Sequence, residues 1–281
     1  EFDTVAYSFA AEKRLYQKIQ TLVDTHYIPL QKLIDYRAQL WKQLCLSGAK
    51  RVTELIVSVA CHREIKTDQS KLRSDFIIED HFHNFVRKAE QQCLHDLLII
   101  FNFSEKDVAI QKIPVSNGQW QLDIFAPGIL KAYGLNVGSA AAKGAAAGAG
   151  IDLMVGGMSL GAASALGAIA GAGWSTFRRY GDEIKATVRG TKWQCADETT
   201  LQILYLRQKH LLKKLMHRGH AAQDTLHVDK ADSEKLPDNW HKITSALRQN
   251  PAWQEASVAR NNNPQFQEIE AKLVGSLLDE R

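Results

Sequence analysis

A long stretch of glycine and alanine, from Gly138 to Gly173, places the strongest constraint on the fold. It contains only two charged residues, Lys143 and Asp152. Glycine costs about 1 kcal/mol relative to alanine in an exposed helix, so a helix with this many glycines needs a close packing partner. Glycines recur here at four-residue spacing, which puts each pair on one helix face that another backbone can approach.

We therefore predict a Gly/Ala-rich helical hairpin, made of two closely packed helices with a break near Asp152 and Gly156-Gly157. Leu153 to Trp174 is uncharged and long enough to cross a hydrocarbon core of about 30 Å. However, each large apolar residue favours insertion by only about 0.3 to 0.6 kcal/mol, whereas an Asp costs about 2.5 to 3.5 kcal/mol. The residues expected to form the hairpin contact are Gly144, Gly148, Asp152, Gly156, Gly157, Gly161, Gly167 and Gly171.

Insertion of this hairpin is marginal by these magnitudes, so two interpretations stay open. The first is a re-entrant membrane hairpin with both ends cytoplasmic, because Lys131 precedes it and Arg178 and Arg179 follow it. The second is a buried helical pair inside a soluble domain, sheltered by long helices. The same weak insertion disfavours a pore-forming segment.

Helical periodicity dominates the N-terminal region, for which we predict a bundle of long helices over residues 1–126. Leu15, Ile19, Leu22 and Val23 fall on one face of a first helix. A second helix of thirty-odd residues follows Pro29, and a third runs from about residue 80 to 101. Alternating residues around Asn117-Gly118 predict one small β-hairpin near residues 108–125. The fold class is therefore mainly α.

Residues 127–222 are expected to pack as one domain with residues 1–126 and to end in a basic amphipathic helix. This helix opens near Asp197, stops at Gly219 and buries a leucine stripe. Its other face is either merely solvated or binds anionic lipid or RNA phosphate. The predicted basic surface comprises Arg178, Arg179, Arg207, Lys209, Lys213, Lys214 and Arg218. Residues 223–281 are expected to form an acidic helical tail.

Motifs for catalysis and ligand binding are missing from the sequence. Without a G-x-x-x-x-G-K-[ST] loop, the chain is not expected to bind nucleotide itself. The histidine pairs His81/His83 and His217/His220 fit helix ends better than metal sites. Four scattered cysteines, without C-x-x-C, predict buried reduced thiols of a cytoplasmic protein. We expect no catalytic residue, no metal and no cofactor in this chain.

Four sequence segments resemble the bacterial domain of unknown function 3482 (DUF3482) family over roughly Phe2 to Ala222. They are "WQLDIFAP", the Gly-rich core, "RRYG" and "RQKHLLKKLMHRGHAA". In that family the domain follows a small Ras-like GTPase domain of the ribosome-assembly type. The resemblance implies that this chain is the C-terminal part of a two-domain GTPase, whose GTP and Mg would bind in the other domain.

Taken together, these features predict a non-catalytic effector or localisation domain of a bacterial GTPase. The leading hypothesis is cytoplasmic, with peripheral association of the Gly-rich hairpin and its basic flanks with an anionic inner membrane. The alternative is a soluble interaction module for a protein or RNA partner, such as a ribosomal particle, with the Gly-rich pair as a buried packing element. In both hypotheses the attached N-terminal GTPase domain is a partner.

Overall fold

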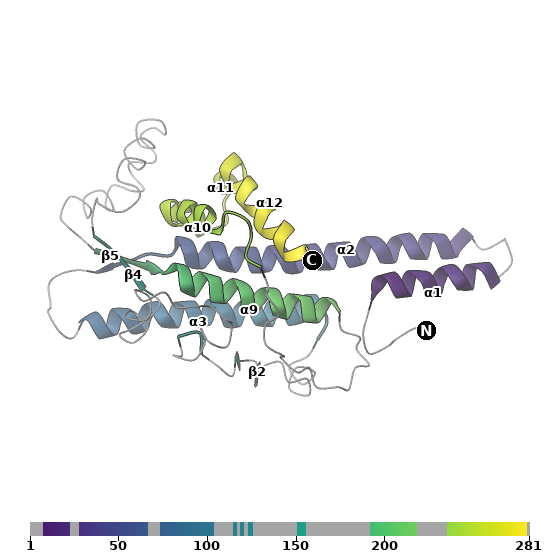
Figure 1. Cartoon of the computed structure of the whole chain (residues 1–281), viewed down its shortest axis with the longest axis horizontal. Helices are drawn as coiled ribbons and strands as arrows, with labels where there is room; N and C mark the ends of the chain where they lie inside the picture. The colour runs from purple at the N-terminus through teal and green to yellow at the C-terminus, as the bar shows by residue number, and fades with distance from the viewer. Residues whose placement is uncertain are drawn as a thin grey trace.

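A single helix of 34 residues, α2 (Ile28–Cys61), runs through the protein and organises the other elements around it (Figure 1). The computed structural model describes residues 8–22, 28–66, 74–103, 115–116, 119–120, 123–125, 151–155, 192–217 and 235–279. The fold is mainly α, as predicted. The other helices of the described part are α1 (Phe9–Leu22), α3 (Ser74–Ile100), α9 (Glu198–Met216), α10 (Trp240–Gln249), η1 (Pro251–Trp253, a 3-10 turn), α11 (Val258–Asn261) and α12 (Pro264–Leu278).

The second half of α2 is the centre of the hydrophobic core. From Ala49 to Cys61 most of its side chains are buried, on several sides of the helix. Such a helix must be surrounded by other elements. Helices α3 and α9 lie along one side of it and α10 to α12 along the other, while α1 packs on its N-terminal half (Figure 1).

Helix α9 starts where the sequence predicts. The side chain of Asp197 caps the helix by accepting a hydrogen bond of 2.6 Å from the backbone N–H of Thr200. The helix then contacts α2, α3 and α10. It ends at Met216, and the predicted stop at Gly219 lies outside the described residues.

A three-stranded antiparallel sheet joins segments that are far apart in the sequence. Its order is β1 (Glu64–Lys66), β5 (Lys192–Ala196) and β4 (Ile151–Val155), and Trp193 pairs with Ile65 on one side and Met154 on the other. Strand β1 follows α2 in the sequence, and strand β5 directly precedes α9.

Strand β4 corrects the prediction of a helical hairpin through these five residues. Asp152 does not mark a break between two helices but lies in the strand, opposite Cys195. Ile151 and Val155 are β-branched, and a short apolar run between glycines suits a strand as well as a helix, so pairing with β5 decides the outcome. The other predicted hairpin contacts lie outside the described residues: Gly144, Gly148, Gly156, Gly157, Gly161, Gly167 and Gly171.

The small β-hairpin is confirmed. Strands β2 (Val115–Ser116) and β3 (Gln119–Trp120) pair antiparallel, with Val115 opposite Trp120 and Ser116 opposite Gln119. Two residues, Asn117 and Gly118, separate the strands. This is the loop length and composition that favours a hairpin.

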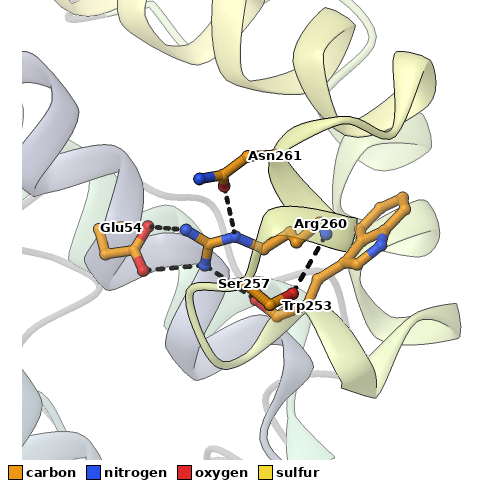
Figure 2. Close-up of polar contacts among 5 residues, drawn as sticks. All are labelled: Glu54, Trp253, Ser257, Arg260 and Asn261. Atoms are coloured by element: carbon orange, nitrogen blue, oxygen red, sulfur yellow. Dashed lines mark hydrogen bonds and ion pairs between the residues drawn. The ribbon is translucent and has the colours of Figure 1, made fainter.

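The C-terminal helices are attached to α2 by a buried arginine, Arg260 of α11 (Figure 2). Its guanidinium forms a two-pronged ion pair with Glu54 of α2, with N···O distances of 2.9 and 3.2 Å. It also donates to the carbonyl of Trp253 at 3.1 Å and lies 4.7 Å from the ring centroid of Phe266. One side chain thus connects α2, η1 and α12.

Two glycines give a matched test of how closely the helices pack. A Cβ atom on Gly48 of α2 would lie 2.7 Å from Leu212 Cδ1 and 2.8 Å from the Phe101 ring, whereas one on Gly275 of α12 would meet nothing within 4 Å. We expect Gly48→Ala to lower the free energy of unfolding by about 1 to 3 kcal/mol, because overpacking outweighs the gain in helix propensity. Gly275→Ala should be neutral or stabilising. Urea unfolding measures both, and equal effects would contradict this account of the α2–α9 contact.

Replacing Arg260 by lysine tests its two-pronged contact. Lysine keeps the charge but cannot reproduce the planar fork, so we expect Arg260→Lys to lower the free energy of unfolding by about 1 to 3 kcal/mol. Lys272→Ala is the control, because Lys272 forms an exposed ion pair with Glu268 within α12. The control should leave the melting temperature unchanged. An Arg260→Lys protein that melts with the wild type would show that the two-pronged geometry of the contact with Glu54 does not contribute to stability.

Candidate functional site

The predicted basic surface of α9 is wrong at two of its residues. Arg207 is 1% exposed and Lys209 is 4% exposed. The prediction assumed one buried stripe, but α9 is enclosed by α2, α3 and α10, so little of its circumference faces solvent. Lys213 and Lys214 are half-buried, and Arg178, Arg179 and Arg218 lie outside the described residues.

The buried cations of α9 have partners in the core. Arg207 Nε lies 3.1 Å from Glu90 Oε1 of α3, and Gln208 Nε2 donates to the same oxygen at 3.4 Å. Lys209 Nζ donates to the carbonyl oxygen of Lys235 at 3.2 Å. Arg207 therefore connects α9 to α3, and Lys209 connects α9 to the backbone of the segment before α10, so neither buried side chain presents its charge to a ligand.

Burial is the main influence on the pKa of the Glu90 carboxyl group. Loss of solvent raises the pKa of its carboxyl group to about 7, although Arg207 and the hydrogen bond from Gln208 act in the opposite direction. Asp123 shows the reverse balance. Burial alone would raise the pKa of Asp123, but the hydrogen bonds from Arg87 and from the backbone N–H of Phe125 outweigh it and lower the pKa.

The segment Asp123–Phe125, within the motif "WQLDIFAP", is anchored on α3. Asp123 binds Arg87 through N···O distances of 2.6 and 3.4 Å and accepts 2.8 Å from the N–H of Phe125. The ring of Phe125 lies 3.8 Å from that of His83 and 5.2 Å from the Arg87 guanidinium, while Ile124 is buried in the core. The motif that carries the family resemblance thus has a packing role here.

The four cysteines are buried and none forms a disulfide, as predicted. Burial raises the pKa of Cys61 and of Cys93 to about 12, so neither is a thiolate at neutral pH. His81 and His83 have different partners: His81 contacts Glu64 at 2.7 Å, and the ring centroid of His83 lies 3.8 Å from that of Phe125. His217 is the exposed C-cap of α9, and its predicted companion His220 is outside the described part. Within that part, no three side chains of His, Cys, Asp or Glu are grouped to hold a metal.

His62, which follows α2 directly, was not among the residues predicted from the sequence. Its ring stacks on Phe85 with a centroid separation of 3.7 Å. Nε2 lies 3.2 Å from Glu64, and Nδ1 lies 3.0 Å from the amide nitrogen of Gln254. These contacts come from α3, β1 and the segment after η1, so His62 connects three elements at the C-terminal end of α2.

Helix α1 and the beginning of α2, which we call the arm, lie at the end of the molecule away from the C-terminal end of α2 (Figure 1). Large apolar side chains that are exposed to solvent gather on this arm. Its α1 residues form one face, as their spacing predicts, but that face is partly exposed to solvent and is not part of the hydrophobic core. We define the arm face as Leu15 (37% exposed), Ile19 (37%), Leu22 (84%), Leu33 (43%) and Tyr36 (61%). Elsewhere in the described residues only Ile99 and Val258 are large, apolar and exposed.

A partly buried ion pair holds the two helices of the arm together. Arg37 of α2 donates to both carboxylate oxygens of Glu12 of α1, at 2.9 and 3.3 Å, and Glu12 is buried. The hydrogen bond with Glu12 also raises the pKa of Tyr16, one turn further along α1. The contact fixes which sides of the two helices face each other.

The arm carries several exposed basic residues. Lys13, Arg14, Lys18 and Lys32 are exposed, and none of them forms an ion pair with another described residue. The acidic Asp35 accepts a hydrogen bond from Gln31 at 2.9 Å. The arm therefore combines an apolar face with an excess of positive charge. No helix of the described part is both long and apolar enough to cross a membrane.

Comparison with known proteins agrees with the resemblance. The family model of a domain of unknown function, DUF3482, matches residues 1–275. The chain belongs to the DUF3482 family. No curated protein and no solved structure matches this DUF3482 domain.

Glu90→Gln tests the buried carboxyl group of the DUF3482 domain. The folded-state pKa is raised from 4.5 to about 7, so between these values the unfolded chain loses a proton that the folded protein retains. Wild-type stability should therefore fall on the order of 2 to 3 kcal/mol as pH rises through this window. Glutamine cannot ionise, so the variant should show a flatter profile.

Urea unfolding between about pH 4.5 and pH 7.5 measures the difference. Glu255→Gln, which changes an exposed carboxylate, should keep the wild-type pH profile. Parallel profiles for wild type and Glu90→Gln would show that Glu90 is ionised throughout and paired with Arg207.

Proposed function

We propose that this DUF3482 domain is a non-catalytic effector and localisation module of a bacterial GTPase, which docks on a cellular partner through the arm face. The observation that carries the proposal is the gathering of exposed large apolar side chains on the arm. Contiguous exposed apolar surface is typical of interaction sites on proteins or membranes.

The link to a GTPase rests on the family resemblance. The attached small Ras-like domain would bind GTP and Mg, and its nucleotide state would control docking. We assign nucleotide binding to the attached domain and docking to this chain. In this chain the thiols of Cys61 and Cys93 are buried, and the basic side chains of Arg207 and Lys209 contact other protein groups.

Burial of those two basic residues also bears on the alternative of an RNA-binding helix. Phosphate contacts require exposed lysines and arginines, and each neutralised phosphate contributes to affinity. With Arg207 and Lys209 inside the bundle, α9 retains few cations for such a surface. A protein partner on the arm face is the form of the soluble interaction module that the geometry favours.

A fractionation experiment tests the proposal in cells. In the natural full-length protein, Leu22→Glu/Leu33→Glu places two charges on the arm face, while Ile99→Glu/Val258→Glu places the same charges on exposed apolar residues elsewhere. We expect the wild type and the second variant to sediment with membranes or particles, and the arm variant to remain in the supernatant.

Circular dichroism and thermal melting of both variants would establish that they fold. An arm variant that folds and still sediments like the wild type would overturn the proposed role of the arm. Separately, the chain on its own should show no affinity for GTP, because its sequence has no phosphate-binding loop.

A further inference from the structure

We infer that the arm face binds the surface of an anionic lipid bilayer, with the two helices of the arm lying flat on it. This inference rests on the proposed docking role of the arm and names its partner. It differs from insertion of the Gly-rich segment, because the contact residues belong to α1 and α2.

Helical geometry places the whole arm face on one side of the arm. Leu15, Ile19 and Leu22 follow the i, i+4, i+7 spacing of one stripe in α1, and Leu33 and Tyr36 follow i, i+3 in α2. The two helices run antiparallel (Figure 1), and the Glu12–Arg37 contact fixes their mutual orientation. Successive residues of a helix are rotated by 100° about its axis. Measured from Glu12 in α1 and from Arg37 in α2, this rotation places the apolar stripes of the two antiparallel helices on the same side of the arm.

The exposure pattern favours a flat partner over a third helix. A helix packed into the groove between α1 and α2 would cover Leu15, Ile19 and Leu33, which are the less exposed members of the arm face. It would leave Leu22 and Tyr36, which are 84% and 61% exposed, in solvent. A planar surface covers the inner and the outer side chains together.

The basic residues beside the arm face favour a negatively charged surface as its partner. Lys18 and Arg14 border the α1 stripe, and Lys32 borders the α2 stripe. A second copy of the chain would bring the same basic edges together, so self-association through this face is opposed. Apolar side chains between lysines and arginines are the pattern of helices that lie at an anionic membrane interface.

Vesicle flotation of the purified chain tests the inference. We expect binding to phosphatidylcholine vesicles that contain about one third phosphatidylglycerol, weak binding to pure phosphatidylcholine, and loss of binding as salt rises above about 0.1 M. Lys18→Glu/Lys32→Glu should reduce binding at least about tenfold, because each basic residue near the surface contributes about one kcal/mol. The control Lys88→Glu/Lys242→Glu makes the same charge change on exposed lysines away from the arm.

A labelling experiment locates the contact. The four native thiols are buried, so a cysteine introduced by Leu22→Cys will react selectively with an environment-sensitive fluorophore. Its emission should shift to the blue on addition of anionic vesicles. The same label introduced by Val258→Cys should not respond.

Failure of this inference is distinguishable from failure of the proposed function. If the purified chain stays unbound on every vesicle, or if the two lysine variants lose binding equally, the lipid inference is overturned. Should the arm still determine sedimentation in cells, the docking role stands with a protein as the partner. If vesicles bind the arm but sedimentation in cells does not depend on it, the proposed function fails.

Discussion

The second half of α2 requires cover on nearly every side, and most of the described architecture follows from this constraint. Val52, Leu55 and Val57 point in different directions around the helix axis, and all three are buried. Helices from both halves of the sequence must therefore meet on α2. Gly48 marks one close contact, where the side chains of Leu212 and Phe101 occupy the space that a Cβ atom would need.

Surrounding one helix so completely also brings charge into the interior. Arg207 cannot reach solvent from its position on α9, and Glu90 lies opposite on α3. Both side chains are costly to desolvate, and without Glu90 the buried Arg207 would lose its partner on α3, so the contact constrains which face α9 turns toward α3. Arg260 does the same for the C-terminal helices, with the difference that its partner Glu54 is partly exposed.

Local signals predicted the elements well where they are strong. Asp197 begins a helix because its side chain can cap one, and Asn117-Gly118 joins two short strands. The failures arise where tertiary contacts decide. Ile151–Val155 is a strand because β5 is available to pair with it, and Arg207 is buried because three helices enclose α9. Conversely, the apolar stripe of α1 has the periodicity of a core helix, and periodicity cannot indicate that no described element covers it.

The continuity of α2 has a mechanical consequence. The same uninterrupted helix forms one side of the arm and the centre of the core, and Figure 1 shows no break between the two parts. Bending at the root of the arm would rupture the i to i−4 hydrogen bonds of several residues, and α2 has no described loop there to act as a hinge. A tilt imposed on the arm is therefore passed on as rotation of the entire helical core. Because α2 is continuous, the orientation of the surface that the arm contacts determines the orientation of the helices packed on the C-terminal half of α2.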